Sequence, residues 1–255
     1  ASGPGPLVEL FNFAVQTFKN AQERKLSSIE CHDLMCFVGQ IVVVGGVRRS
    51  AMISLSNLSD DRMRHAKSGQ WWETAAHRAL ANNSVAYTEK PDMETFMREW
   101  LSLVESKSGE RGVFNRYASI KQAAKNGRRE TAYHFGTNPC SEIILRPYQF
   151  CNLTEVVVRA TDTIEDLERK VRMATILGTI QSTYIKFPYL RKVWQRNTEE
   201  ERLLGVSLTG IMDNRLMTHK NQGLDKTLEH LKNVAISTND ELARRLNVPP
   251  SAAIS

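Results

Sequence analysis

The chain has 255 residues, of which 41% are hydrophobic and 24% are charged, as is typical of a soluble globular protein. No apolar run approaches the ~20 residues that a membrane span requires, and the N-terminal residues lack the basic and apolar regions of a signal peptide, so we expect no membrane location. The net charge of +6 favours polyanionic partners, but the aromatic content of 7% gives little support to a nucleic-acid surface built on base stacking.

The first quarter of the chain predicts two helices followed by two short strands. Apolar residues at helical spacing predict an amphipathic helix over 6–25. A second helix is expected to begin at Ser28, whose hydroxyl would serve as its N-cap. The β-branched run 41–44 and the segment 52–55 predict two short buried strands. The glycine pair Gly45-Gly46 interrupts the apolar pattern and predicts a loop between them.

The middle of the chain continues the alternation. Helices are expected over 92–106 and 117–126, and strands over 143–145 and 153–158. The basic run 125–129 is expected to be a solvated face.

The last third is dominated by two predicted helices. One opens at Thr163 and runs to about residue 186, with acidic residues in its favourable first turn. The other covers 224–246 and ends before two prolines. Between them, residues 198–201 have the pattern of a capping box that opens a helix before Leu203. Helices alternating with short buried strands predict an α/β protein.

One segment combines side chains suited to chemistry. Asn138, Cys140 and Glu142 occupy alternating positions, and a second thiol follows at Cys151. Alternate residues of an extended segment share a face, so the first three are expected to face one pocket. A cysteine nucleophile normally works with a histidine, and the nearest is His134, which gives hydrolase chemistry weak support. Radical chemistry needs no such base; it needs a shielded, rigidly held sulfur, a carboxylate and nearby thiols.

The four cysteines have irregular spacing that fits neither a metal site nor a secreted disulfide framework. A reducing cytoplasm is therefore the expected location. We expect Cys31 and Cys36 to be packing residues, and we assign no residue as a metal ligand.

Several motifs together resemble the large, catalytic subunit of ribonucleotide reductases. The runs Asn138-Pro-Cys140-Ser-Glu142-Ile and Phe150-Cys151-Asn152-Leu153 look like its active-site signature. The Asn-Pro-Cys form resembles the adenosylcobalamin-dependent class. Further matches follow in the expected order along the chain, at residues 45–51, 78–85, 109–115 and 204–210.

The resemblance implies a fold and a role for each matching residue. Residues 1–255 would be the central portion of a single catalytic domain, a ten-stranded α/β barrel with a finger loop inside it. Cys140, at the tip of that loop, would carry the thiyl radical that takes the 3′ hydrogen of the ribose. Glu142 would be the general base toward the 3′ hydroxyl, Asn138 would hold the ribose, and Cys151 would be one of two thiols that reduce the 2′ carbon.

A second site follows from the resemblance to the family's specificity loop. That loop connects a deoxynucleotide effector site with the base of the substrate. Arginine offers planar, multidentate donors for a base or a phosphate, and two glycines let the loop adopt unusual backbone angles. The residues concerned are Gly45, Gly46, Val47, Arg48, Arg49 and Ser50.

The implied reaction is the reduction of ribonucleotides, with triphosphates favoured, to 2′-deoxyribonucleotides. The implied cofactor is adenosylcobalamin, and the implied partners are ribonucleotide, deoxynucleotide effector and thioredoxin or a similar dithiol. The cysteine that pairs with Cys151 in the family lies on an earlier barrel strand, upstream of this sequence, and N-terminal and C-terminal parts of the same enzyme would be further partners. Three alternatives stay open: the large subunit of a diiron-dependent reductase, a catalytically incomplete nucleotide-binding fragment, and a basic nucleic-acid-binding domain.

Overall fold

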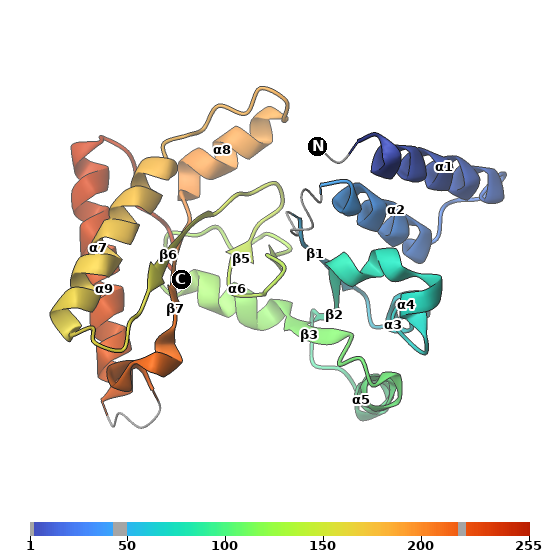
Figure 1. Cartoon of the computed structure of the whole chain (residues 1–255), viewed down its shortest axis with the longest axis horizontal. Coiled ribbons are helices and arrows are strands. Elements are labelled where there is room, and N and C mark those ends of the chain that lie inside the picture. Colours follow the sequence, from blue (N-terminus) through green and yellow to red (C-terminus); the bar gives the residue numbers. More distant parts are fainter. Residues whose placement is uncertain (1–2, 43–49, 219–222) are drawn as a thin grey trace. The chain divides into compact units, whose positions relative to one another are not determined.

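The computed structural model describes residues 3–42, 50–218 and 223–255, which belong to two compact units (Figure 1). Unit 1 comprises Ala1–Gln122 and His134–Ile144, and unit 2 comprises Ala123–Tyr133 and Leu145–Ser255. Across these described ranges, no helix is both long and apolar enough to cross a membrane. The prediction that residues 1–255 form the central portion of one barrel domain stays a prediction.

Unit 1 is built on a small parallel sheet with the order β1-β2-β3. The strands are β1 (Met52–Ser56), β2 (Ala81–Tyr87) and β3 (Gly112–Asn115). Strand β2 lies in the centre and all but one of its residues are buried. The predicted strand at 52–55 is confirmed. At 41–44 the first two residues form a turn instead of a strand, and the other two lie outside the described residues.

Helices accompany this sheet along the sequence. They are α1 (Gly5–Asn20), α2 (Ser28–Gln40), α3 (Asp61–Arg64), α4 (Trp71–Thr74), a 3₁₀ helix at Ala76–Leu80, α5 (Met93–Ser106) and α6 (Arg116–Ala124), the last of which ends in unit 2. The four longer predicted helices are thus confirmed, although the first ends earlier than residue 25.

The predicted N-cap of α2 is wrong by one residue. The hydroxyl of Ser27, not that of Ser28, accepts the backbone N–H of Glu30, and the Glu30 carboxylate accepts the backbone N–H of Ser27 at 2.8 Å. This reciprocal pair satisfies two N–H groups that the helix itself leaves unpaired. Ser28 instead donates its hydroxyl to Asp60 at 3.0 Å.

Unit 2 has a second parallel pair, β6 (Asn152–Val157) and β7 (Leu204–Thr209), in register from Asn152 opposite Leu204. Its helices are α7 (Ile164–Gln181), α8 (Lys192–Glu201) and α9 (Leu224–Arg245), with short 3₁₀ helices at Ile211–Asp213 and Arg215–Met217. Figure 1 shows α7 and α9 side by side next to the two strands. The main apolar core lies between them and contains Val156, Val158, Leu167, Val171, Ala174, Met217, Leu231, Val234 and Ala235.

The predicted start of α7 at Thr163 is confirmed, although the helix ends at Gln181 and not near residue 186, and the capping box predicted at 198–201 is wrong. The Thr163 hydroxyl accepts the N–H of Asp166, as expected for the start of α7. Residues 198–201 instead form the last turn of α8, where the Thr198 hydroxyl donates to the carbonyl of Trp194 at 2.8 Å. Arg202 follows with a left-handed φ of 43°, which ends the helix and leads the chain into β7.

The basic run 125–129 is exposed to solvent at residues 125–128, as predicted, but its last residue, Arg129, is buried. Arg128 donates to the carbonyls of Pro250 and Ser251 at 2.7 and 2.8 Å. Arg129 forms an ion pair with Glu201 at 2.9 Å, and the two side chains are only 3% and 4% exposed. These arginines therefore hold the segments of unit 2 together.

Two very short strands complete the described structure. Strands β4 (Gly136–Thr137) and β5 (Ile144–Leu145) pair with each other and enclose the loop 138–143. The predicted strands at 143–145 and 153–158 are confirmed as β5 and β6. Helices alternating with parallel strands confirm the expected α/β class.

Candidate functional site

The loop between β4 and β5 carries three of the four predicted catalytic residues. It is not an extended segment: the N–H of Ser141 donates to the carbonyl of Asn138 at 3.0 Å, and Ser141 has a left-handed φ of 68°. The prediction that Asn138, Cys140 and Glu142 share one face of an extended strand is therefore wrong. A tight turn places them close together instead, at the tip of a hairpin-like loop.

The side chain of Asn138 braces this turn. Its amide oxygen accepts the N–H of Ile143 at 3.0 Å and the hydroxyl of Thr137 at 3.3 Å. Thr137 also lies 3.0 Å from the carbonyl of Ile143, whose side chain is buried. The amide nitrogen of Asn138 bonds to no residue in the described part of the chain, so it is a donor available to a ligand.

Cys140 and Glu142 are exposed, and Cys140 is a free thiol. Neither side chain has a hydrogen-bond or ion-pair partner among the residues described. The shielding that a thiyl radical requires is thus not supplied by these residues. The turn presents a thiol and a carboxylate, two residues apart, to whatever binds over it.

The base of the loop is fixed to unit 1. Arg116, at the start of α6, donates through Nε to the carbonyl of Phe135 at 2.8 Å, and the ring of Phe135 is completely buried. Near the tip, Nδ2 of Asn82 on β2 donates to the carbonyl of Pro139 at 2.7 Å. Sequence reasoning gave Asn82 no role, although it lies in the run 78–85 that resembles the family.

Cys151, the fourth predicted catalytic residue, lies in unit 2 directly before β6 and is half-buried. Its neighbour Asn152 makes two hydrogen bonds to one acceptor, because its backbone N–H and its side-chain amide both donate to the carbonyl of Leu203, at 2.9 and 3.1 Å. Two residues before Cys151, the buried amide of Gln149 donates to Glu201. The thiol thus sits on a well-anchored segment.

The other two cysteines behave differently from each other. Cys36 is fully buried, and its sulfur lies 3.1 Å from Nδ1 of His32. Burial raises the pKa of the Cys36 thiol to about 12, so it stays protonated and unreactive. The packing role predicted for Cys36 is confirmed, whereas Cys31 is exposed and the same prediction for it is wrong.

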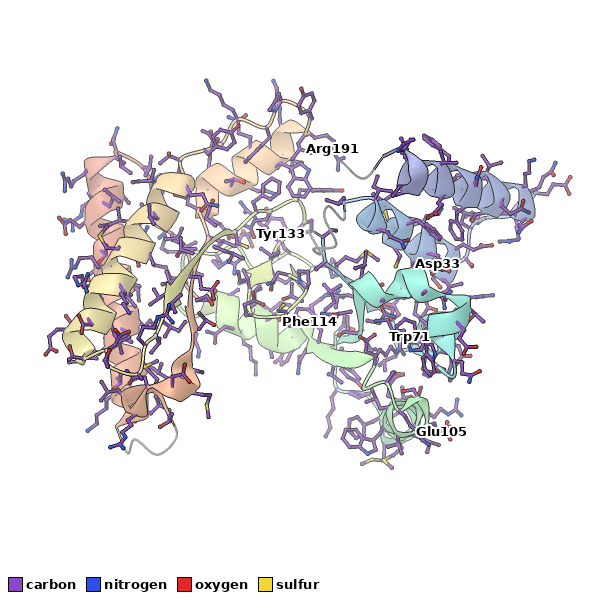
Figure 2. All side chains as sticks on the ribbon, viewed as in Figure 1. Asp33, Trp71, Glu105, Phe114, Tyr133 and Arg191 are labelled. Atoms are coloured by element: carbon purple, nitrogen blue, oxygen red, sulfur yellow. The ribbon has the colours of Figure 1, made fainter. Side chains whose placement is uncertain are left out.

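Two buried ionic clusters involve the runs 78–85 and 109–115, which also resemble the family. Asp33, which is labelled on α2 in Figure 2, accepts hydrogen bonds from Nε and Nη2 of Arg78 at 2.6 Å each. Burial alone would raise the pKa of Asp33, but hydrogen bonds from Arg78 and His77 lower it to about 2. The carboxylate therefore stays ionised and ties α2 to the start of the run 78–85.

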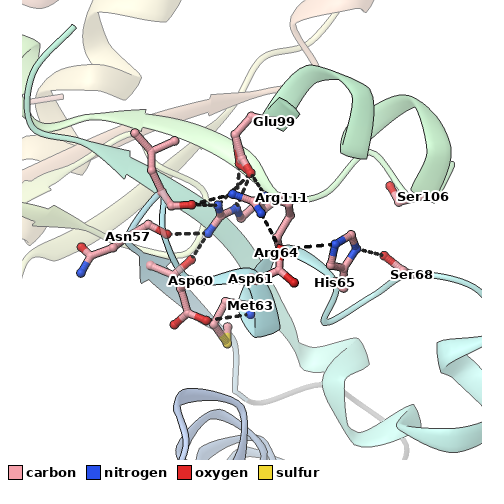
Figure 3. Close-up of polar contacts among 12 residues, drawn as sticks. Asn57, Asp60, Asp61, Met63, Arg64, His65, Ser68, Glu99, Ser106 and Arg111 are labelled. Atoms are coloured by element: carbon pink, nitrogen blue, oxygen red, sulfur yellow. Dashed lines mark hydrogen bonds and ion pairs between the residues drawn. The ribbon is translucent and has the colours of Figure 1, made fainter. Parts of the chain in front are cut away.

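The second cluster centres on Arg111, in the run 109–115. Figure 3 shows Arg111 and Arg64 converging on Glu99 of α5, with Arg111 Nη2 and Arg64 Nε each 2.7 Å from the carboxylate. Burial alone would raise the pKa of Glu99, but these arginines hold it below its ordinary value. Arg111 also donates to Ser56 Oγ at 2.8 Å and to the carbonyl of Asn57 at 2.9 Å, which joins β1, β3 and α5.

Most of the predicted specificity loop, Gly45, Gly46, Val47, Arg48 and Arg49, lies outside the described residues. Its last residue, Ser50, is described and half-buried. The Ser50 hydroxyl lies 3.4 Å from the position that a Cβ would take on Gly39, near the end of α2. The described residues thus bracket the loop between α2 and β1. In the same described ranges, no cluster of three or more His, Cys, Asp or Glu could hold a metal ion.

Comparison with known proteins gives a consistent set of relatives. No family model matches the chain. The adenosylcobalamin-dependent ribonucleoside-triphosphate reductase of Levilactobacillus brevis is 32% identical over 228 residues, which cover 86% of this chain and 29% of that protein. The protein of the same name from Lactobacillus gasseri is 32% identical over 224 residues, which cover 84% of this chain and 28% of the relative. The chain therefore spans less than a third of the length of these curated relatives.

A solved structure supports the same comparison at the level of the fold. The crystal structure of a B-12 dependent (class II) ribonucleotide reductase matches with a TM-score of 0.73 and 22% sequence identity, over 100% of this chain and 38% of that one. The match confirms the expected fold, an α/β arrangement that is part of the barrel of these reductases.

Proposed function

Because the chain belongs to the family of adenosylcobalamin-dependent ribonucleotide reductases, we propose that it is the central part of a catalytic chain that reduces ribonucleoside triphosphates to 2′-deoxyribonucleotides. The observation that carries the proposal is the braced turn at 138–143. It presents an exposed thiol, an exposed carboxylate and an amide donor together. The same turn carries the motif that first suggested the family.

Cys140 is the residue that starts the reaction. As a thiyl radical it takes the 3′ hydrogen atom of the ribose and becomes a thiol, which leaves the unpaired electron on the 3′ carbon. Such a step depends on the reacting atoms being held within a few tenths of an ångström of their productive positions. The hydrogen bonds of Asn138 within the turn supply part of that rigidity.

Glu142 and Asn138 act on the ribose hydroxyls. The Glu142 carboxylate accepts the proton of the 3′ hydroxyl, for which hydrogen-bond reach matters first. Asn138 uses its two amide atoms differently: the oxygen braces Ile143, and the nitrogen donates to a ribose oxygen.

Cys151 supplies one of the two thiols that reduce the 2′ carbon. Two thiols together give two electrons and two hydrogens, the 2′ hydroxyl leaves as water, and a disulfide forms. The Cys140 thiol then returns its hydrogen atom to the 3′ carbon and becomes a radical again. A dithiol protein such as thioredoxin then returns the disulfide to thiols by exchange. The second thiol is proposed to come from further parts of the same catalytic chain, and a reductant of this kind places the enzyme in the cytoplasm.

The cofactor implied by the relatives' names is adenosylcobalamin, and the described residues fit it at one point, the exposed thiol of Cys140. When bound, it supplies the one-electron chemistry that turns this thiol into a radical. What the chain contributes is the position of the thiol.

The segment 45–50 is proposed to carry effector information to the substrate base. Arg48 and Arg49 would donate to the base or phosphates, and the flanking elements α2 and β1 would hold the two ends of the loop. A deoxynucleotide effector would therefore change which ribonucleotide is reduced fastest.

The test is an assay of deoxynucleotide formation by the complete catalytic chain that contains this sequence, with a dithiol reductant, with and without adenosylcobalamin. Cys140→Ser should abolish product. Cys31→Ser, which removes another exposed thiol of unit 1, should leave the rate unchanged. Turnover that persists in Cys140→Ser, or that does not depend on the cobalamin, would rule the proposal out. A requirement for a second, radical-supplying subunit would instead favour the diiron-dependent type.

A further inference from the structure

We propose that Asn82 is a positioning residue for Cys140, because its side chain holds the carbonyl that directly precedes the reactive residue. The inference rests on the proposed function. The contact is the bond from Asn82 Nδ2 to the carbonyl of Pro139 at 2.7 Å, and both residues belong to unit 1. Proline has no N–H, so this carbonyl is the only backbone hydrogen-bonding group that Pro139 offers.

Asn82 stands on a rigid part of the unit. It belongs to the central strand of the three-stranded sheet, with Ile53 of β1 opposite it. Because side chains alternate along a strand, its neighbour Asn83 points to the opposite face, where it is buried. There Asn83 Oδ1 lies 2.9 Å from Nε2 of His32 on α2.

The tautomer of His32 follows from its two contacts. Burial lowers the pKa of His32, so its ring is neutral and has one donor and one acceptor nitrogen. Asn83 Oδ1 can only accept, so Nε2 carries the proton and Nδ1 accepts from the Cys36 thiol at 3.1 Å. This chain of hydrogen bonds fixes β2 to α2 on one face while Asn82 holds the loop on the other.

The remaining braces of the loop act elsewhere. Thr137, Asn138 and Ile143 close its base, and Arg116 holds the residue before β4. Within the described ranges, Asn82 is the only side chain from outside the loop that bonds to residues 139–142. Loss of this one contact therefore frees the tip, with Cys140, while the base stays closed.

The consequence should be seen in turnover more than in substrate binding. A displacement of about 1 Å at a reacting group can lower a rate about 100-fold. Asn82 touches the loop backbone and not the substrate, so we expect kcat to fall about 10- to 100-fold in Asn82→Asp while KM changes less than about threefold. The aspartate has the same size as asparagine, but it places an oxygen against the Pro139 carbonyl and has no proton to donate.

The experiment compares three variants in the complete catalytic chain. Asn82→Asp removes the donor, and Asn82→Gln keeps it and should recover part of kcat. The matched control is Asn126→Asp, since Asn126 Nδ2 makes the same kind of bond to the carbonyl of Ala252, at 2.8 Å, in unit 2. Hydrogen exchange of the segment 136–145 is measured on the same proteins, and it should become several-fold faster in Asn82→Asp alone.

The outcomes separate the two proposals. A kcat of Asn82→Asp within twofold of the parent, or no greater loss than in Asn126→Asp, would overturn the inference. Faster exchange throughout unit 1 would also overturn it, because it would indicate general destabilisation. If Cys140→Ser were active, the proposed function would fail, yet the exchange measurement would still test whether Asn82 holds the loop.

Discussion

Arg111→Met should be among the most destabilising single substitutions in unit 1. The Arg111 and Glu99 side chains are 2% and 5% exposed and lie 2.7 Å apart. Besides Glu99, Arg111 donates to Ser56 Oγ and to the carbonyls of Asn57 and Leu58, so all three of its nitrogens are engaged. Breaking a buried pair by removing one partner typically costs about 3–5 kcal/mol. Glu99 keeps Arg64 at 2.7 Å, so we expect a cost of about 3 kcal/mol.

The chain offers a closely matched control. Arg98 and Glu94 lie 2.6 Å apart, but their side chains are 69% and 75% exposed. A solvent-exposed pair of this kind contributes about 0.5 kcal/mol, so Arg98→Met should change little. Urea unfolding followed by tryptophan fluorescence measures both variants. Equal losses of stability in the two variants, or a loss below about 1 kcal/mol in Arg111→Met, would refute the reasoning from burial.

Three further predictions concern other parts of the chain. Gly210 has a φ of +73°, and a Cβ there would lie 2.5 Å from the carbonyl oxygen of Val158. Gly210→Ala should therefore lower the free energy of unfolding by about 1–3 kcal/mol and lower the Tm. An unchanged Tm would contradict this geometry. A thiol reagent at pH 8 should label Cys140 in the folded protein and Cys36 only after unfolding, because Cys36 is buried and burial raises the pKa of its thiol to about 12. Labelling is followed by mass spectrometry, and equal labelling rates for the two cysteines would contradict the prediction. The pKa of Asp33 is lowered from 3.8 to about 2, so the stability it adds is complete above about pH 4 and is lost as the pH falls toward 2. In Asp33→Asn the free energy of unfolding should therefore depend less on pH between about 4 and about 2. An unaltered pH dependence would show that the ion pair of Asp33 is not coupled to folding.

Local signals in the sequence predicted the long elements well. Helical spacing found α1, α5 and α9, and the acidic residues after Thr163 correctly marked the start of α7. The capping-box pattern at 198–201 was misleading, because a hydroxyl and a carboxylate three residues apart also fit the last turn of a helix. The upstream residues of α8 are mostly polar and gave no competing signal.

Strand β2 could not be found from sequence. Its start, Ala-Asn-Asn-Ser, lacks the β-branched residues that favour strands. The two asparagines find their partners at Pro139 and His32, both more than 50 residues away. Such long-range hydrogen bonds leave no periodic trace in a single sequence, and the partner of Arg129 at Glu201 was hidden in the same way.

The residues of the candidate site were predicted from the sequence, but the backbone conformation of the loop that carries them was not. The motif identified Asn138, Cys140 and Glu142, whereas the alternation argument placed them on an extended strand. The left-handed φ of Ser141 creates the turn, and a serine in that conformation has no strong sequence signal. The role of the Asn138 amide oxygen as a brace for Ile143 emerged only from the structure.

The central claim is that Cys140 removes the 3′ hydrogen of a ribonucleotide. The most direct measurement compares the rate of deoxynucleotide formation from a ribonucleoside triphosphate with that from its 3′-deuterated form, in the complete catalytic chain with adenosylcobalamin and a dithiol. The account predicts slower turnover of the deuterated substrate in the parent and in Cys31→Ser, and no product in Cys140→Ser. Equal rates for the two substrates, or product formation by Cys140→Ser, would contradict it.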